Sequence, residues 1–329
     1  MTYLLLAAGL GLLFLGGELL VRGAVGTATR LGISPMVIGL TLVGFGTSTP
    51  ELVASLQAAL GGAPGIAIGN IVGSNIANIL LILGTSGLIL PILVNPQAFR
   101  RDGTMLTLAT LALILACLGG ELGRIAGALF LVGLVGYTIY SYISDKRMND
   151  ATARMHAAEA DYVAEQEPVK TASIGRSLLI TGIGIAGVML GANFLITSAV
   201  EVARTFGLSE AVIGLTLVAI GTSLPELVTS VMAALRKHGE VAFGNVIGSN
   251  IFNALGIGGV TALVQPIAIP PEVLALDIWV MAAATGLLLV FAWTGWRIGR
   301  REAGVFLAAY VLYFVVQLSP AVRGALGLA

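Results

Sequence analysis

Long apolar stretches separated by short polar breaks dominate the chain. Cutting the sequence at charges, prolines and glycine clusters leaves ten stretches of about the 20 mostly apolar residues that a membrane-spanning helix needs. They cover about residues 2–29, 34–60, 66–91, 104–119, 124–143, 175–203, 209–235, 241–265, 273–295 and 302–318. The pattern predicts an all-α polytopic membrane protein with ten transmembrane helices.

One segment between the fifth and sixth stretches is soluble in character. Residues 144–176 hold 11 of the 34 formally charged residues in a tenth of the chain. This segment is too short to fold as an independent domain. We therefore expect a first unit of residues 1–143, a polar loop of residues 144–174 and a second unit of residues 175–329.

Composition supports the membrane assignment and excludes other classes. Hydrophobic residues make up 57% of the 329 residues and charged residues only 10%, whereas a soluble domain carries about a quarter charged residues. The 44 glycines suit close helix packing in a bilayer. With a net charge of zero, the chain has no basic field to bind nucleic acid. The partner it predicts is the lipid bilayer, and it gives no indication of oligomeric state.

The distribution of basic residues predicts an orientation. If the N-terminus is outside and ten spans alternate, the inner loops collect fourteen of the 17 Lys and Arg residues, and the outer side keeps only Arg124, Arg204 and Arg323. Cytoplasmic loops carry such an excess of positive charge. We expect both termini to be external and loop 144–174 to be cytoplasmic, in a protein of the cytoplasmic (inner) membrane.

The sequence contains an internal repeat. Residues 34–84 align without gaps onto residues 209–259 at an offset of 175, with 30 identities in 51 positions. Each half then contains five spans. Because five is odd, the second half enters the membrane from the opposite side, so the repeats are inverted, as in many secondary transporters.

Two glutamates occupy equivalent positions deep in apolar stretches. Glu51 lies in GTSTPELV and Glu226 in GTSLPELV. A charged group at mid-membrane is costly unless it is paired, and its duplication favours a pair of cation ligands. The alternative is a glutamate that is satisfied by neighbouring amides or kept protonated.

The residues before each glutamate predict broken helices. Pro50 and Pro225 cannot donate the usual helical hydrogen bond, and glycines loosen the preceding turn. We therefore expect spans 2 and 7 to be broken, which would leave the backbone carbonyls of Gly44 and Ala219 free to face a cavity.

Hydroxyl and amide side chains recur around the glutamates at helical spacing. Hydroxyls three and four residues before each glutamate share its helix face, and partner helices carry polar residues at i, i+4 and i+8. The side chains assigned to the site are Thr47, Ser48, Ser74, Asn78, Thr222, Ser223, Ser249 and Asn253. For Asn70 and Asn245 the sequence leaves both a site role and polar contact between helices open. Asn75 and Asn250, which sit off that face, are assigned to polar contacts between helices.

The combined donor set consists of oxygen atoms alone. Such sets suit the hard cations Na⁺, Ca²⁺ and Mg²⁺, and Ca²⁺ accepts six to eight flexibly placed oxygens. Two glutamates balance the charge of one Ca²⁺ or of two Na⁺, so one cage could hold each in turn.

The segments GTSTPEL…GNIVGSNIANI and GTSLPEL…GNVIGSNIFNA closely resemble the two α-repeats of the cation/calcium exchanger superfamily, in particular its prokaryotic sodium/calcium exchanger branch. The resemblance implies a ten-helix inverted-repeat fold and alternating access, with several Na⁺ entering for each Ca²⁺ expelled. By motif position it implies ligands at Thr47, Ser48, Glu51, Ser74, Asn78, Thr222, Ser223, Glu226, Ser249 and Asn253. Some members carry an aspartate where this chain has Asn78 or Asn253.

Other functions remain as alternatives. Two buried glutamates could carry protons in a proton-coupled Ca²⁺/cation antiporter, and a channel is a third possibility. An intramembrane hydrolase would need a catalytic motif, but HExxH and GxSxG are absent. We therefore predict a secondary active transporter, not an enzyme, without a cofactor. Glu18 and Asp277 also lie in apolar stretches, where we expect a cavity mouth or a pairing between helices.

Overall fold

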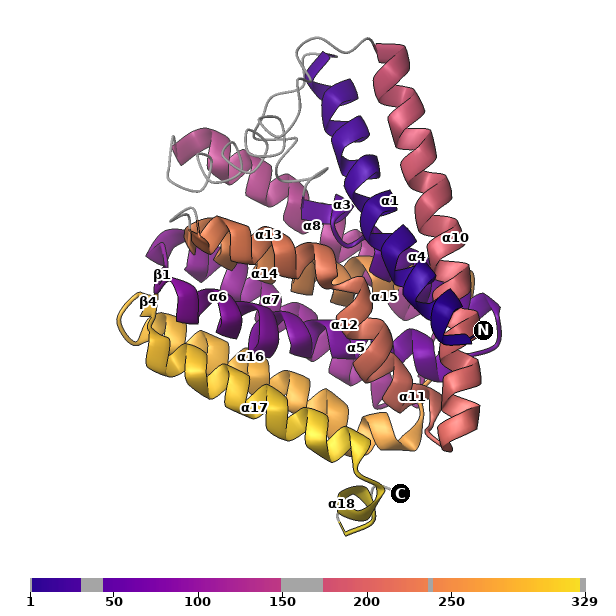
Figure 1. The fold of residues 1–329 in the computed structure, drawn as a ribbon. Coiled ribbons are helices and arrows are strands. Elements are labelled where there is room, and N and C mark those ends of the chain that lie inside the picture. Colours follow the sequence, from indigo (N-terminus) through magenta and orange to yellow (C-terminus); the bar gives the residue numbers. More distant parts are fainter. Residues whose placement is uncertain (1, 31–43, 149–173, 236–238, 326–329) are drawn as a thin grey trace.

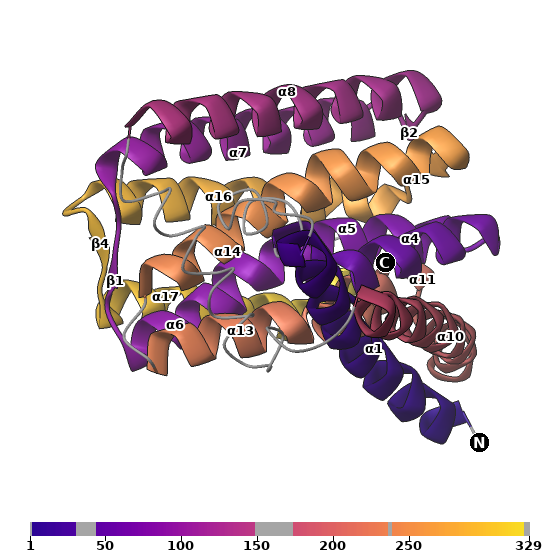
Figure 2. The same ribbon diagram turned by 90° about the horizontal axis from the view of Figure 1, so that it is seen from above.

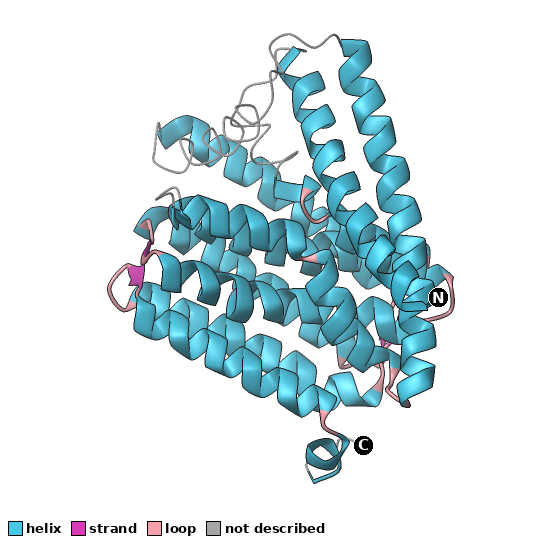
Figure 3. Ribbon diagram, viewed as in Figure 1, coloured by secondary structure: helices cyan, strands magenta, loops and turns pink. Residues whose placement is uncertain are grey.

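The computed structural model describes residues 2–30, 44–148, 174–235 and 239–325, and these residues are almost entirely helical (Figures 1 and 3). The first half contains α1 (Thr2–Arg30), α3 (Gly44–Gly46), α4 (Thr49–Leu60), α5 (Pro64–Ala77), the π-helical segment η2 (Asn78–Leu83), α6 (Gly84–Ile89), β1 (Ile92–Leu93), α7 (Pro96–Cys117), β2 (Glu121–Leu122) and α8 (Arg124–Met148).

The second half has a similar order of elements. It contains α10 (Ile174–Phe206), α11 (Glu210–Ile213), η3 (Gly214–Val218), α12 (Ala219–Thr222), α13 (Leu224–Leu235), α14 (Gly239–Ile251), η4 (Phe252–Ile257), α15 (Gly258–Val264), β3 (Ile267–Ala268), η5 (Val273–Asp277), α16 (Ile278–Trp293), β4 (Arg297–Ile298), α17 (Arg300–Leu318) and α18 (Pro320–Ala325).

Seven helices in the described ranges are long and apolar enough to cross a membrane, and the bent pair Glu210–Thr222 and Leu224–Leu235 makes an eighth. Two of the ten predicted stretches are not among these. Residues 34–43 of the second stretch lie outside the described residues, and the stretch at 104–119 corresponds to α7. Most of the predicted polar loop, residues 149–173, also lies outside the described residues.

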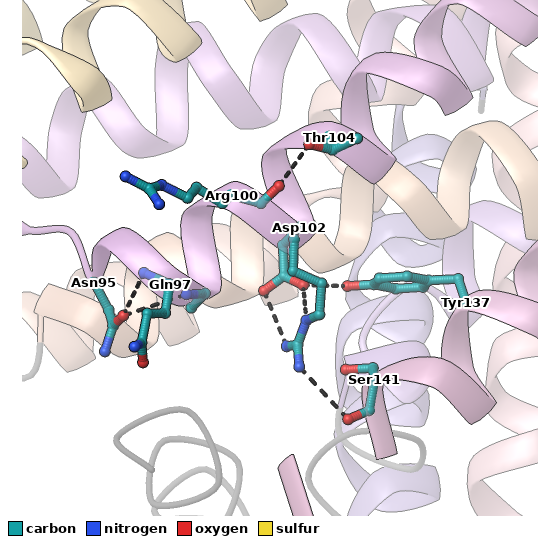
Figure 4. Close-up of polar contacts among 9 residues, drawn as sticks. Asn95, Gln97, Arg100, Asp102, Thr104, Tyr137 and Ser141 are labelled. Atoms are coloured by element: carbon teal, nitrogen blue, oxygen red, sulfur yellow. Dashed lines mark hydrogen bonds and ion pairs between the residues drawn. The ribbon is translucent and has the colours of Figure 1, made fainter. Parts of the chain in front are cut away.

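Helix α7 begins at Pro96, before the apolar stretch predicted at about 104–119. The Asn95 side chain accepts hydrogen bonds from the backbone N–H groups of Gln97 and Ala98, at 2.9 and 3.2 Å, and so caps the helix. Arg100, Arg101 and Asp102 therefore lie inside the helix instead of in a loop (Figure 4).

Helices α1 and α10 form an antiparallel pair that stands beside the other helices (Figure 1). A Cβ atom built on Gly9 would lie 2.7 Å from the backbone nitrogen of Leu195, and one built on Gly16 would lie 2.7 Å from that of Val188. As the residue number increases along α1, the number of the contacted residue on α10 decreases, so the helices run in opposite directions. Only glycine permits this backbone approach.

Elements of one half pair with elements of the other half in a reciprocal way. Strand β1 pairs antiparallel with β4, and β2 pairs antiparallel with β3. Helix α6 packs against α17, and α8 packs against α15. Because Ile92 is equivalent to Ile267 at the offset of 175, the two strand pairs are related by an approximate two-fold exchange of the halves.

The centre of the molecule is occupied by the helices that carry the predicted polar ligands. In an 18-residue apolar stretch of each helix, 94% of the stretch within Pro64–Ile89 and 78% of that within Gly239–Val264 is buried, whereas the stretches in the other apolar helices are 22–39% buried. Figure 2 shows α5 and α14 in the middle, with α7 and α8 along one side. The protein interior thus forms around these two spans, and the outer helices present apolar side chains to their surroundings.

Equivalent aspartates connect outer helices in each half. The Asp102 carboxylate on α7 accepts a hydrogen bond from the Tyr137 hydroxyl on α8 at 2.9 Å (Figure 4). In the second half Asp277 accepts one from the Tyr313 hydroxyl on α17, also at 2.9 Å. Asp277 thus pairs between helices, one of the two expected outcomes. Glu18 instead forms an ion pair with Arg22 of its own helix.

Candidate functional site

Glu51 and Glu226 lie at equivalent helix starts in the middle of the molecule. Each is the third residue of its helix, α4 or α13, and each is 1% exposed. At Ser223 the chain bends by 48° between α12 and α13, so the break expected before Glu226 is present. In the first half α3 ends at Gly46 and α4 begins at Thr49. The partial positive charge of a helix N-terminus favours both carboxylates.

The two halves exchange hydrogen bonds at the glutamates. The Ser48 hydroxyl donates to Glu226 Oε1 at 2.8 Å, and the Ser223 hydroxyl donates to Glu51 Oε1 at 2.9 Å. The Ser-x-x-Glu sequences would allow a capping box, in which each serine serves its own helix. Ser48 makes no such bond to α4, so the serines serve the opposite carboxylate instead.

An asparagine on each central helix fixes the helix that carries the glutamate. The Asn70 amide donates to the Glu51 carbonyl at 3.1 Å and to the Ser55 hydroxyl at 2.8 Å. The second half repeats this arrangement with Asn245, Glu226 and Ser230, at 3.3 and 2.9 Å. These asparagines therefore hold the backbone of the site. The sequence had left open whether they have a site role or only make polar contacts between helices.

The remaining bonded hydroxyls lie around Asn70. Its Oδ1 accepts from the Thr222 hydroxyl at 3.0 Å and lies 3.4 Å from the Ser74 hydroxyl. The carbonyl of Ala219 is not free, because it accepts a hydrogen bond from the Ser223 backbone at 3.1 Å. The prediction of a free carbonyl there is wrong, since α12 closes its last turn through it. The other carbonyl predicted to be free is that of Gly44, which is the first residue of α3.

Several buried oxygen atoms of the predicted ligands have no hydrogen-bond partner among the residues that the structure describes. They are Thr47 Oγ1, Glu51 Oε2, Asn78 Oδ1, Glu226 Oε2, Ser249 Oγ and Asn253 Oδ1. Thr47 and Ser249 lie near the Glu226 carboxylate, but neither has hydrogen-bond geometry with it. Buried polar atoms are normally hydrogen-bonded. A set of unpaired oxygens from both halves, including one from each carboxylate, fits a cation.

The two asparagines predicted as ligands, Asn78 and Asn253, lie where the central helices change their winding. The π-helical segment η2 begins at Asn78, and η4 contains Asn253. Short π-helical segments inside α-helices are frequent at functional sites. Both asparagines are buried, with 0% and 1% exposure.

The charge of the site comes from two carboxylates. Glu51 and Glu226 are close enough for their charges to interact. In the described ranges no three His, Cys, Asp or Glu side chains form a group suited to a metal ion. Neutral hydroxyl and amide oxygens complete the set. This is donor chemistry for Na⁺ or Ca²⁺, not for zinc or copper.

Sequence reasoning missed some residues that support the site. Ser55 and Ser230 are identical at equivalent positions of the repeat, and this identity was the signal that could have identified them. The polar contact between helices assigned to Asn250 is confirmed, because the Asn78 amide donates to Asn250 Oδ1 at 2.9 Å, whereas the Asn75 side chain bonds within its own helix. The choice of Asn78 as the partner of Asn250 had no comparable signal. It depends on how the two halves fit together.

Comparisons with known proteins agree with this geometry. The family described as sodium/calcium exchanger protein matches residues 1–143 and 176–319. Two similar proteins are the putative antiporter CaxA of Alkalimonas amylolytica, 39% identical over 93% of this chain and 95% of the relative, and the sodium/calcium exchanger MaX1 of Methanosarcina acetivorans, 34% identical over 96% and 98%.

A solved structure is similar over the same extent. The sodium-calcium exchanger NCX_Mj, soaked with 10 mM Na⁺ and no Ca²⁺, superposes with a TM-score of 0.65 at 32% identity, covering 97% of this chain and all of that one. The resemblance drawn from the duplicated motifs is confirmed. The chain belongs to the sodium/calcium exchanger family, in the prokaryotic branch of the cation/calcium exchanger superfamily.

Proposed function

We propose that this protein is a secondary active antiporter that exchanges Na⁺ for Ca²⁺ across the cytoplasmic membrane by alternating access. The observation that carries the proposal is the reciprocal pair of bonds from Ser48 to Glu226 and from Ser223 to Glu51. These bonds leave Oε2 of each glutamate buried and without a hydrogen-bond partner in the part of the chain that the structure describes. One cage with two negative charges is therefore built jointly by two repeats, and its charge matches one Ca²⁺ or two Na⁺.

The same side chains can hold either ion. We assign the ligands to Thr47, Ser48, Glu51, Ser74, Asn78, Thr222, Ser223, Glu226, Ser249 and Asn253, with backbone carbonyls of Gly44 and Ala219. A serine hydroxyl has one hydrogen and two lone pairs. Ser48 and Ser223 can thus keep their bonds to the carboxylates while their oxygens contact a cation. A carbonyl also has two lone pairs. That of Ala219 accepts from the Ser223 backbone at 3.1 Å and lies 3.4 Å from the Thr222 hydroxyl. It can serve when that hydroxyl gives its one hydrogen to Asn70 instead.

The proposed architecture is two inverted repeats of five spans, residues 1–143 and 175–329, joined by a cytoplasmic loop of residues 144–174. The antiparallel packing of the equivalent helices α1 and α10 supports inversion, because equivalent spans of parallel repeats would run in the same direction. The proposal needs the ten spans, with α4 and α13 as the second parts of broken spans 2 and 7. Both termini are then external.

Flux measurements in vesicles test the exchange. Purified protein is reconstituted into Na⁺-loaded vesicles, and uptake of radiolabelled Ca²⁺ is measured with and without a Na⁺ gradient at fixed pH. We expect uptake only with the outward Na⁺ gradient, and a proton ionophore should not change it. Uptake driven by a pH gradient without Na⁺ would instead identify the alternative, a proton-coupled Ca²⁺/cation antiporter. Absence of Ca²⁺ uptake under both gradients would reject both.

Reporter accessibility tests the orientation. A label placed at Gly62, in the turn between α4 and α5, should react from outside the cell, as should one at the C-terminus. A label at Arg147 should react only after the membrane is opened. Gly62 and Arg147 on the same side of the membrane would contradict the inverted arrangement.

A further inference from the structure

A chain of three asparagines connects the two central helices. The Asn78 amide nitrogen lies 2.9 Å from Asn250 Oδ1, and the Asn250 amide nitrogen lies 3.1 Å from the backbone carbonyl of Asn75. All three residues are buried, with exposed fractions of 0–3%. Asn78 Oδ1 has no hydrogen-bond partner among the described residues.

The direction of this chain is determined at its far end. The backbone carbonyl of Asn75 can only accept, so the atom of Asn250 that faces it must be the NH₂ group. The other amide atom of Asn250 is then the oxygen, which can only accept, so Asn78 must present its NH₂ group to it. The carbonyl oxygen of Asn78 is consequently directed away from Asn250. Asn78, the first residue of η2, follows Asn70 and Ser74 at four-residue spacing and so lies on the same face of the central span as they do.

The equivalent amide in the second half has no such support. The counterpart of Asn250 is Asn75, whose side chain donates at 2.7 Å to the carbonyl of Ile71 in its own helix. Within the described ranges neither amide atom of Asn253, the counterpart of Asn78, has a hydrogen-bond partner. The two-fold relation that holds for the serines and glutamates therefore breaks at these asparagines.

We propose that Asn250 is a positioning residue for the cation site: it turns the Asn78 amide so that its carbonyl oxygen, and not its NH₂ group, faces the ion. This inference rests on the proposed function, because it takes Asn78 as a ligand. If the amide turned its NH₂ group toward the cation, the cation would lose one ligand and would face a repulsive dipole. Asn253 has to be oriented by the ion itself.

Two isosteric variants form the test, with the repeat supplying the control. Asn250→Leu removes the bond to Asn78, and Asn75→Leu removes a bond within one helix at the equivalent position. Equilibrium binding of radiolabelled Ca²⁺ to the purified full-length protein gives the Kd. We expect Asn250→Leu to raise the Kd on the order of two- to tenfold, the effect of one net hydrogen bond. Asn75→Leu should change it by less than about twofold.

A double-mutant cycle separates positioning from general packing. In an Asn78→Ala background there is no amide to orient, so adding Asn250→Leu should not raise the Kd further. A packing effect would persist in that background, and would lower the thermal midpoint of Asn75→Leu and Asn250→Leu alike. If Asn250→Leu does not fold, Asn250→Ala enters the same cycle.

The outcomes distinguish this inference from the proposed function. If wild-type protein binds Ca²⁺ but the two leucine variants raise the Kd equally, the positioning role is rejected and the exchanger proposal stands. The same holds if the effect of Asn250→Leu is undiminished in the Asn78→Ala background. If wild-type protein shows no Ca²⁺ binding, the proposed function fails, and this inference fails with it.

Discussion

The first and second halves of the proposed cation site hold their glutamates alike but differ in the side chains around them. The serine-to-carboxylate bonds measure 2.8 and 2.9 Å, and the asparagine-to-carbonyl bonds measure 3.1 and 3.3 Å. By contrast, Asn78 is hydrogen-bonded across the halves and Asn253 is not. Each half contributes one glutamate carboxylate, so the two halves match in charge.

An aromatic pair is the second difference. Phe45, just before the break in the first half, stacks on Phe252 at the start of η4, with ring centroids 4.6 Å apart and an interplanar angle of 14°. The equivalent positions are occupied by Ile220 and Ala77, which cannot form an aromatic stack. An aromatic stack is thus present at one of the two equivalent positions and absent from the other.

These differences have a physical meaning for an alternating-access exchanger. Strict two-fold symmetry between inverted repeats would leave the site equally open or closed toward both sides of the membrane. A conformation that faces one side must therefore break the symmetry somewhere. In this structure the glutamates keep the two-fold symmetry, whereas the amides and the aromatic pair break it.

The largest predicted effect tests the part in which the halves match. Glu51→Gln and Glu226→Gln each keep the size of the side chain but remove one negative charge, so a bound Ca²⁺ would carry uncompensated charge in a buried site. Na⁺-driven Ca²⁺ flux should fall on the order of 100-fold or more in either variant. The double variant should lose little more, because the two residues act as one unit.

The control for this comparison is Glu121→Gln, an exposed glutamate in β2, which should transport normally. Near-normal flux in folded, purified Glu51→Gln protein would overturn the site assignment. A large difference between Glu51→Gln and Glu226→Gln would instead show that the halves are unequal in charge as well.

The second prediction concerns the equivalent helices α1 and α10. Gly16 and Gly191 are equivalent, and a Cβ atom on either would lie 2.7 Å from a backbone nitrogen of the opposite helix. Gly16→Ala and Gly191→Ala should each destabilise the protein by about 1–3 kcal/mol, because overpacking forces the helices apart. The thermal midpoint in detergent measures the loss.

Gly182→Ala is the matched control, since a Cβ atom there has no neighbour within 4 Å. We expect its midpoint to equal that of the unmodified protein. Unequal losses at Gly16 and Gly191 would mean that the two-fold relation does not extend to this helix pair.

The repeat explains why much of the site could be predicted from the sequence. An offset of 175 aligned Glu51 with Glu226 and Ser48 with Ser223, and helical spacing placed the nearby hydroxyls on the same face. The break at Ser223 followed from Pro225 and the preceding glycine. These are local properties of the chain, so the sequence contains them.

What could not be predicted depends on how the halves meet. Local spacing does not reveal that Ser48 bonds to the glutamate of the other repeat, because a capping box within α4 satisfies the same pattern. The bond between Asn78 and Asn250 likewise depends on packing between the two central helices. The helical start of α7 at Pro96 was not predicted, because three adjacent charges were taken for a loop, although Asn95 caps a helix that contains them.

The third prediction compares the two amide ligands. Asn253→Asp adds a carboxylate where no hydrogen bond is lost, so transport should persist with tighter Ca²⁺ binding or altered ion coupling. Asn78→Asp places a carboxylate against Asn250 Oδ1, and two acceptors then face each other. We expect Asn78→Asp to lower the stability by about 1–2 kcal/mol relative to Asn253→Asp. Thermal midpoints measure this difference, and equal midpoints would contradict the asymmetry.

The smallest predicted effect concerns the aromatic pair. If the stack of Phe45 on Phe252 stabilises one facing state, removing it should shift the balance toward the other state. Stacked aromatic pairs contribute about 0.5–1.5 kcal/mol beyond their buried area, which corresponds to about a two- to tenfold change in the ratio of the states. The apparent Ca²⁺ affinity on each side depends on the fraction of protein facing that side.

Phe252→Ala should therefore change the Ca²⁺ KM in opposite directions on the two sides, raising it on the side that the stacked state faces. Measuring the KM in right-side-out and inside-out vesicles tests this. Ile220→Ala is the control, because it truncates a side chain at the position equivalent to Phe45 where there is no stack, so neither KM should move by a comparable factor. A KM that moved in the same direction on both sides would show that Phe252 affects ion binding itself. The aromatic pair would then belong to the cation cage, and the asymmetry between the halves would lie in their ligands and not in the balance of their conformations.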